Sequence, residues 1–443
     1  MSSSFLQNII THGSKYFTGS IVSAGVALIM TKYYTFVFNP ADFGVLALYL
    51  VMFQYVISLA SLTLDSGSTR FYFDYRKTKR DEYLSTMFWF ITAIAIVVLI
   101  LGVVFMKPVS NWISPNSEVI YLTTLVTGIG AVYVSYLTRI LYNEHKSTSV
   151  LKHTIFQTFI NHASSVLFIS VFHMGIFGRM SGQGLGYILN IFTLIREFSK
   201  ENLFKIKMTF NKAMAKETFI LSLPGMMSVL LGVAFIYLDR FFLKHYIGDS
   251  AVGIYTLGYM LGKGLSMVYE AISQAILPKV FSDMNENYER ARDELEYFSY
   301  RYYIGLAIIT IIISALSPVI VVLFSNDDYS EAATVMPFVM AGFMMGGFYK
   351  IPALVLGYHK IVWFYPFLAI FAFGTNALLN WLLIPIYGML GSAFASFVGL
   401  FLYSTVLQIF SFKYFSKMYS ITMIFMYIIL FIIIFILFQI GDF

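Results

Sequence analysis

The 443-residue chain contains no cysteine and few charged residues. Without cysteine it can form no disulfide, no thiolate metal site and no thiol nucleophile. Charged residues make up 12% of the chain, about half of their share in an average soluble domain. The net charge is +6, but the basic residues are scattered rather than gathered on one face. An ordinary soluble protein and a nucleic-acid-binding protein are therefore both excluded.

Long apolar runs dominate what is present. The chain is 58% hydrophobic and contains 45 Phe and 32 Tyr. Its runs reach about 20 residues, the length that crosses a bilayer as a helix. Aromatic residues at the ends of such runs are typical of membrane helices. We therefore predict an all-α polytopic membrane protein with twelve spans and an additional C-terminal span over Ile421–Ile440.

The order of spans and charged loops divides the chain into parts. We expect an N-terminal lobe of spans 1 to 6 and, after a basic cytoplasmic linker, a C-terminal lobe of spans 7 to 12. Apolar residues recur at helical spacing between spans 8 and 9, which predicts an amphipathic helix on the membrane surface or packed on its own protein. The expected ranges are 1–196 for the first lobe, 197–217 for the linker, 218–412 for the second lobe, 281–302 for the amphipathic helix and 413–443 for the additional span.

The distribution of Lys and Arg predicts the orientation in the membrane. With a cytoplasmic N-terminus, 23 of the 29 Lys and Arg residues lie in cytoplasmic loops or at the cytoplasmic ends of spans. Such a bias is the usual signature of the cytoplasmic side. The outer side keeps five basic residues, which include Arg179 and Arg240, and Lys263 lies inside a span.

Two motifs indicate an internal repeat. Asp42–Leu46 after span 1 resembles Ala251–Tyr255 after span 7, and Leu141–Lys146 resembles Leu356–Lys360. The offsets are about 209 and 214 residues. Six spans per repeat place both halves the same way up in the membrane, as in transporters built from parallel repeats. We expect two six-helix lobes around a central cavity.

One face of span 8 carries polar and charged residues. Tyr259, Lys263, Ser266 and Glu270 follow one another at helical spacing. A charge inside a span normally faces a protein interior or a water-filled cavity. Lys263 is thus the leading candidate for a cationic residue in the cavity. A structural link between Lys263 and Glu270, or a lysine reaching to the interface, is the alternative.

Two further groups are candidates for polar roles. His153, Gln157 and Asn161 form a stripe on span 5 that either hydrogen-bonds sugars or joins helices. Asp239 and Arg240 lie at the outer end of span 7. For this pair we favour a gate or a structural ion pair over a binding role. We expect no metal site, because the His residues lack further ligands at suitable spacing.

Several ordered motifs resemble a known superfamily. They are N-P-x-x-F-G-x-L after span 1, R-F-Y-F-x-Y over Arg70–Tyr75, L-P-G over Leu223–Gly225 and D-R-F-F-L-x-x-Y-I-G over Asp239–Gly248. Together they resemble the multidrug/oligosaccharidyl-lipid/polysaccharide exporter superfamily, and within it the polysaccharide transporter branch of Wzx-type O-antigen flippases. The resemblance implies a two-lobed bundle in the bacterial inner membrane. It also implies a role in lipopolysaccharide, capsule or exopolysaccharide synthesis.

The implied activity is flipping of an undecaprenyl-diphosphate-linked oligosaccharide by alternating access. The partners would be this glycan lipid, membrane lipid and other polysaccharide-assembly proteins, with no cofactor, no catalytic residue and no nucleic acid, and we expect a monomer. A diphosphate favours cationic contacts, so Arg70 and Lys15 at the cytoplasmic side join Lys263 as candidates. Both could equally be ordinary cytoplasmic anchors. An ion-coupled drug antiporter that uses Glu270, and a polymerase or acyltransferase of the same pathway, remain alternatives.

Overall fold

The computed structural model describes residues 3–75 and 78–414, and these residues form helices and turns without any strand. Eight of the helices are long and apolar enough to cross a membrane. The predicted all-α membrane class is therefore confirmed. The additional C-terminal span that was expected over Ile421–Ile440 lies outside the described residues.

The chain forms two compact units. Unit 1 comprises Met1–Tyr34 and Val45–Ala234, and unit 2 comprises Thr35–Gly44 and Phe235–Phe443. Unit 2 thus also includes the short segment Thr35–Gly44, which lies between the two parts of unit 1 in the sequence. The boundary between the units falls inside the long helix α9 (Lys212–Tyr246).

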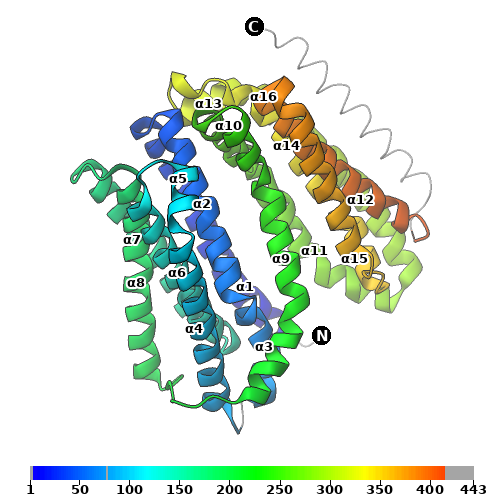
Figure 1. Ribbon diagram of the computed structural model, residues 1–443. Helices are drawn as coiled ribbons and strands as arrows, with labels where there is room; N and C mark the ends of the chain where they lie inside the picture. The colour runs from blue at the N-terminus through cyan, green and yellow to red at the C-terminus, as the bar shows by residue number, and fades with distance from the viewer. Residues whose placement is uncertain (1–2, 76–77, 415–443) are drawn as a thin grey trace. The chain divides into compact units, whose positions relative to one another are not determined.

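Unit 1 is a helical bundle (Figure 1), and its apolar core also includes residues of the segment 203–215. Its buried apolar residues include Tyr83, Met87, Leu137 and Phe198. The α7–α8 hairpin packs closely on itself and on α6. The helices of this unit are α1 (Ser3–Val37), α2 (Pro40–Ser61), α3 (Leu64–Tyr75), α4 (Arg80–Val104), α5 (Met106–Ile113), α6 (Glu118–Asn143), α7 (Ser147–Ser170), α8 (Gly175–Glu201) and the first part of α9.

Unit 2 is a second bundle, in which α14 contacts most of the other helices. Several of its membrane-length segments are broken into two helices by a short interruption. The helices are α10 (Asp249–Gly262), α11 (Gly264–Glu286), α12 (Tyr288–Ala315), α13 (Ser317–Phe324), η1 (Asp327–Tyr329), α14 (Ala332–Phe348), α15 (Lys350–Tyr358) and α16 (Tyr365–Ser411).

The sequence Asn-Pro-Ala-Asp sets the start of α2. Pro40 occupies the first helical position, where its missing N–H costs nothing. The Asn39 side-chain oxygen accepts a hydrogen bond from the Asp42 backbone N–H at 2.9 Å. The Asp42 carboxylate lies in the first turn, where the helix dipole favours a negative charge. Local chemistry thus accounts for the first motif of the repeat.

The two repeat motifs meet in unit 2 through their glycines. A Cβ atom placed on Gly44 would overlap the Asp249 carbonyl oxygen, and one placed on Gly253 would overlap the Pro40 carbonyl oxygen. Each pair, Pro40 with Asp249 and Gly44 with Gly253, is separated by the predicted offset of about 209 residues. The reciprocal contact is what a local two-fold relation between the motifs produces. It explains why both motifs carry glycine.

Glycines also allow α10 to approach α14. A Cβ on Gly258 would lie 3.0 Å from the Ala332 carbonyl oxygen, and one on Gly262 would lie 3.0 Å from Val339 Cγ1. Small residues four positions apart permit such close helix packing. The spacing therefore fixes which face of α10 is turned toward α14.

The predicted spans 11 and 12 appear as the two halves of α16. Gly388 separates them with a backbone φ of 58°, a left-handed conformation that glycine adopts without strain. The stretch predicted as an amphipathic surface helix is divided between α11 and α12. Its apolar residues Ala291, Leu295 and Tyr302 are buried in the protein.

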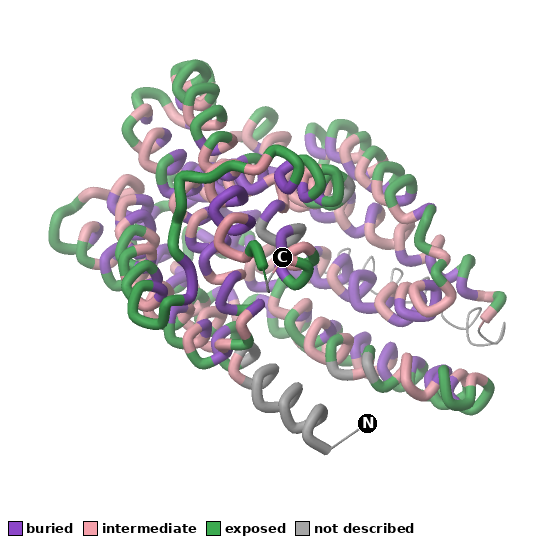
Figure 2. Tube along the Cα trace, turned by 90° about the horizontal axis from the view of Figure 1, so that it is seen from below, coloured by how far each residue is buried: buried purple, intermediate pink, exposed green. Residues whose placement is uncertain are grey.

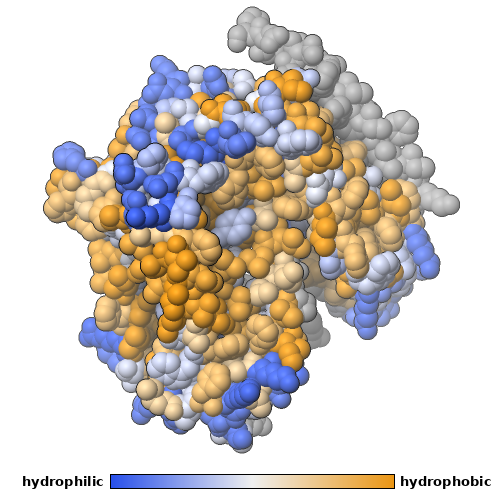
Figure 3. Space-filling model, viewed as in Figure 1, coloured by the Kyte–Doolittle hydropathy of each residue, from blue (hydrophilic) through white to orange (hydrophobic). Residues whose placement is uncertain are grey.

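The surface agrees with burial in a membrane. Figure 2 shows that most helices have a buried face and an exposed face. In Figure 3, apolar residues cover the flanks of the helices, whereas hydrophilic residues gather toward their ends. Many exposed side chains are large and apolar, for example Ile100 on α4 and Phe192 on α8. Such exposure is expected where lipid replaces water as the solvent.

Candidate functional site

A buried ion pair forms the centre of the polar cluster in unit 2. Asp239 and Arg240 lie near the end of α9 and are exposed by only 1% and 2%. The Arg240 Nη1 atom lies 2.6 Å from Asp239 Oδ1 and also donates to the Ile236 carbonyl oxygen at 2.7 Å. A charge at this depth needs such pairing, because an isolated one would be very costly.

Three tyrosines complete this cluster. The Tyr255 hydroxyl donates to Asp239 Oδ2 at 2.6 Å. The Arg240 guanidinium lies 4.1 Å from the centre of the Tyr259 ring, 5.1 Å from that of Tyr255 and 5.5 Å from that of Tyr237. Aromatic faces attract a cation that is removed from water. Asp239 is therefore fully engaged, and Arg240 is held in one position.

Lys263 lies at the junction of two helices, one turn after Tyr259. It is the single residue between α10 and α11, and its backbone N–H donates to the Tyr259 carbonyl oxygen at 2.9 Å. Its side chain is exposed, and its charged neighbour is Arg240. Ser266 is half-buried one turn further along. Within the described residues Lys263 forms no ion pair, so its charge is available to a ligand.

Glu270 has a different partner from the one considered in the sequence analysis. Its Oε1 atom lies 2.6 Å from Lys350 Nζ at the start of α15. The same ammonium lies 5.2 Å from the Tyr349 ring and 5.6 Å from the Tyr269 ring. The polar face of span 8 therefore divides into a paired carboxylate and an unpaired lysine. Lys350 was not among the predicted site residues, because helical spacing cannot identify a partner 80 positions away.

The predicted stripe on α7 faces α8 in unit 1. His153 Nδ1 lies 2.8 Å from Asn190 Oδ1, and its Nε2 lies 2.8 Å from Glu197 Oε2. Asn190 in turn donates to Gln157 Oε1 at 2.7 Å. Asn161 lies so close to Gly186 that a Cβ on that glycine would overlap the amide. The stripe thus forms hydrogen bonds and close contacts between two helices.

Arg70 and Lys15, the two candidates predicted at the cytoplasmic side, each have a polar partner within unit 1. Arg70 donates from Nη1 to both carboxylate oxygens of Asp74, at 2.7 and 2.8 Å, and both side chains are exposed. Lys15 Nζ donates to Thr148 Oγ1 at 2.7 Å. Arg70 therefore resembles an exposed i,i+4 ion pair on a helix surface, and Lys15 links α1 to α7.

Arg179 is a buried arginine that the sequence analysis counted only among the basic residues of the outer side. It lies on α8 and is 8% exposed. Its guanidinium lies 5.2 Å from the centre of the Tyr34 ring, and Nη1 lies 3.4 Å from Ser165 Oγ. Its Nε atom is buried and has no hydrogen-bond partner among the described residues. A lone arginine inside the glycine-rich run 175–186 was the available signal for a buried charge.

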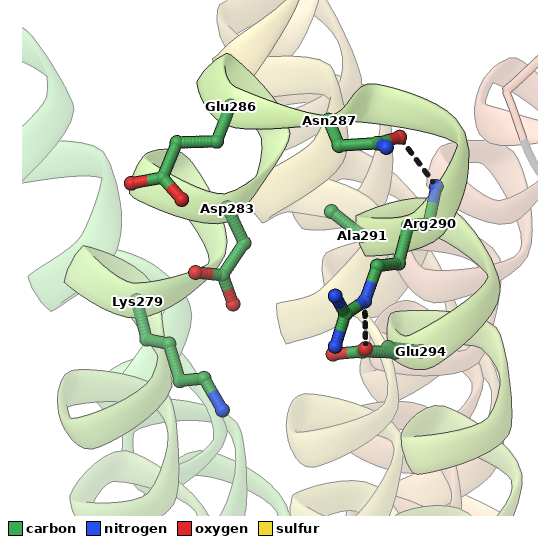
Figure 4. A pocket seen from close by; sticks show the side chains of 7 residues that line it. All are labelled: Lys279, Asp283, Glu286, Asn287, Arg290, Ala291 and Glu294. Carbon is green, nitrogen blue, oxygen red and sulfur yellow. Dashed lines mark hydrogen bonds and ion pairs between the residues drawn. The ribbon is translucent and has the colours of Figure 1, made fainter.

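A hollow lies between the end of α11 and the start of α12. Figure 4 shows Arg290 and Glu294 bonded to each other on one side, with Lys279 and Asp283 on the other. The hollow measures about 260 Å³. Asn287 accepts a hydrogen bond from the Arg290 backbone N–H at 3.1 Å and so caps α12. These contacts stabilise the turn between the two helices.

No group of three or more His, Asp or Glu residues suited to a metal ion occurs in the part of the chain that the structure describes. Most of the charged groups described above are paired with one another, whereas Lys263 has no ion-pair partner among the described residues.

The helices and their order define the class of protein as a multi-pass membrane protein with the two-lobed fold of MOP superfamily transporters. The structure matches an inward-facing multidrug resistance MATE family transporter of that superfamily with a TM-score of 0.72 and 14% identity, covering 88% of this chain and 93% of the other. It matches the lipid II flippase MurJ in an inward closed conformation with a TM-score of 0.73 and 15% identity, covering 97% and 93%.

The family follows from the sequence. A family model described as "Polysaccharide biosynthesis protein" matches residues 7–285, and the chain belongs to this family. An uncharacterized membrane protein of Haemophilus influenzae is 21% identical over 292 residues, which are 65% of this chain and 68% of that protein. The resemblance to the polysaccharide branch of the superfamily is therefore confirmed.

Proposed function

We propose that the protein is a secondary transporter that flips an undecaprenyl-diphosphate-linked oligosaccharide from the inner to the outer leaflet of a bacterial cytoplasmic membrane. Membership of the polysaccharide biosynthesis family supports a substrate of this class. The fold shared with a lipid II flippase and a multidrug transporter supports movement by alternating access. Movement of an anion outward would also be favoured by a membrane potential that is negative inside.

The observation that carries the proposal is the state of Lys263. It is exposed at a helix junction and forms no ion pair with any described residue. Its charged neighbour Arg240 is itself a cation. The carboxylate that neutralises Arg240, Asp239, is occupied by Arg240 and Tyr255. A diphosphate would supply the negative charge that this cluster lacks.

The other candidates take supporting roles in this proposal. Tyr259 positions Arg240 through its ring, and Ser266 offers a hydroxyl one turn from Lys263. Arg70, which is exposed, would contact the diphosphate before it reaches Lys263 by releasing Asp74. Lys15 would contribute there less strongly, because Thr148 already binds its ammonium.

The antiporter alternative depends on Glu270 as a carboxylate that exchanges an ion. The Lys350 ammonium lies 2.6 Å from this carboxylate. A bound ammonium competes with a proton or Na⁺ for the same oxygens, so Glu270 is less suited to ion coupling than a free carboxylate. This contact favours the flippase over the antiporter.

The decisive experiment reconstitutes the chain in liposomes with a fluorescent undecaprenyl-diphosphate sugar. Protection of the label from an impermeant quencher reports its transfer between leaflets. We expect transfer above protein-free liposomes, and a loss of about tenfold in Lys263→Ala, which is the size expected for one charge-assisted contact. Lys279→Ala is the matched control, because Lys279 is exposed at the end of α11 in the same unit.

Two results would contradict the proposal. Equal transfer by the wild type and Lys263→Ala would remove the lysine from the pathway. Absence of transfer together with ion-driven uptake of small cations would move the assignment to an antiporter. In that case Glu270→Gln, rather than Lys263→Ala, would abolish transport.

A further inference from the structure

A basic cavity lies between α7 and α8 in unit 1. It measures about 480 Å³. Lys152 from α7 and Arg196 and Lys200 from α8 contribute three cations to its wall. The two helices form a hairpin, so the beginning of α7 lies beside the end of α8. The three charges therefore gather at one end of this helix pair.

Both carboxylates of this cavity contact another side chain through one oxygen. Glu197 Oε2 accepts from His153, which is buried between the two helices, whereas Glu197 Oε1 has no hydrogen-bond partner among the described residues. Glu201 is paired with Lys146 at the other rim. Lys152, Arg196 and Lys200, in contrast, form no ion pair with any described residue, and all three are exposed. The cavity thus has a net positive charge, and its cations surround the hydrogen-bonded pair His153–Glu197.

Apolar side chains continue from the cavity along both helices. Ile155 and Phe159 follow Lys152 at helical spacing on α7, and both are exposed. Phe192 and Ile195 precede Arg196 on α8, and they are also exposed. Phe159 and Phe192 are exposed by 67% and 64%. A cationic end with an apolar continuation has the polarity of the boundary between lipid headgroups and acyl chains.

Two polar side chains of α7 point at α8 rather than outward. His153 and Gln157 both bind Asn190, so their hydrogen-bonding groups are satisfied inside the hairpin. The outer face of the hairpin is consequently more apolar than the average composition of α7 suggests. Such a face is suited to acyl chains, and cations at its end can reach phosphate while their stems stay in contact with lipid.

We infer that the outer face of the α7–α8 hairpin is a binding site for an anionic phospholipid. The phosphate of the headgroup occupies the cavity between Lys152, Arg196 and Lys200, and the acyl chains lie along Phe159 and Phe192. The site recognises a phosphate group attached to an apolar tail, which distinguishes it from a site for a soluble phosphate. It is independent of the proposed flipping activity and of Lys263.

Native mass spectrometry of the full chain in detergent tests the site with phosphatidylglycerol as the probe and phosphatidylcholine as the neutral comparison. The test variant is Lys152→Gln/Arg196→Gln/Lys200→Gln. The control is Lys205→Gln/Lys212→Gln/Lys216→Gln, which removes the same charge from exposed lysines outside the cavity. We expect one phosphatidylglycerol to be retained, with affinity reduced by about tenfold or more in the test variant only.

A second variant separates recognition from folding. Lys152→Arg/Lys200→Arg keeps the charges and is expected to retain the lipid. Equal retention by the test and control variants would overturn the site. Displacement of the phospholipid by millimolar inorganic phosphate would overturn the lipid as its ligand and assign the cavity to a soluble phosphate. Equal retention of phosphatidylcholine would show that the acyl face alone binds lipid, which also contradicts the inference.

Discussion

The polar clusters of the two units differ in whether each of their charged groups has a partner within the protein. In unit 1, His153 has an oxygen acceptor at each ring nitrogen, so the cluster on α7 and α8 is closed on itself. In unit 2, Asp239 and Arg240 are likewise closed, but Lys263 beside them has no carboxylate. A polar residue inside a membrane span can therefore either hold helices together or stay available to bind a ligand. Its partners decide which role applies, whereas its position along the helix does not.

The buried pair in unit 2 offers the strongest way to break this comparison. Asp239→Asn removes the carboxylate charge and leaves Arg240 buried without compensation. We expect a loss of about 3 to 5 kcal/mol in the free energy of unfolding, as for other buried pairs that lose one partner. Denaturant unfolding of the purified protein in detergent measures it.

The ion pair of Lys244 and Asp249 in the same unit provides the control, because both side chains are only partly buried. Asp249→Asn is expected to cost at most about 1 kcal/mol, because water can replace the lost partner. If both variants lost the same stability, burial would not be what makes the Asp239–Arg240 pair important.

The glycine contact between the repeat motifs should give the next largest effect. Gly44→Ala places a methyl group against the Asp249 backbone, which cannot move away as a flexible side chain could. Overpacking of this kind costs about 1 to 3 kcal/mol, and Gly253→Ala should cost a similar amount because the contact is reciprocal. Gly232→Ala, where no atom lies within 4 Å, should be neutral or slightly stabilising.

The closed cluster of unit 1 should show a smaller, coupled effect. His153→Leu leaves Asn190 and Glu197 without their partner, and Glu197 is only partly buried, so we expect a loss of about 1 to 2 kcal/mol. Asn190→Leu should cost a similar amount. The double variant should be less destabilised than the sum of the two, because both remove one shared network. Strict additivity would mean that the cluster does not act as a unit.

The comparison also shows how far the sequence could lead. Apolar runs, the Gly44 and Gly253 motifs and the adjacent pair Asp239–Arg240 are local signals that can be read directly from the sequence. Spacing also identified the polar face of α7. It could not identify Asn190 and Glu197 as the partners on that face, or Lys350 as the partner of Glu270, because hydrogen bonds between distant helices leave no periodic pattern.

Arg179 shows a related limit. The position of Arg179 near the outer end of a glycine-rich span indicated a charge on the outer side, but it did not indicate that the side chain is buried. The glycines are in fact what allows α8 to approach α7. A Cβ on Gly182 would overlap Ser165, the residue that also contacts the Arg179 guanidinium. The close packing of α8 on α7 and the buried Arg179 therefore involve the same residue, Ser165.

The smallest effect on stability should come from the residue with the largest proposed effect on transport. Lys263→Gln removes a charge that no described residue neutralises, so the free energy of unfolding should change by less than about 0.5 kcal/mol. Lys350→Gln, by contrast, leaves Glu270 unpaired and should destabilise the protein. If Lys263→Gln instead unfolded the protein, the lysine would be a structural residue and the contrast between the two clusters would fail. If Lys263→Gln kept normal stability but lost flipping, Lys263 would serve transport, whereas the paired charges serve stability.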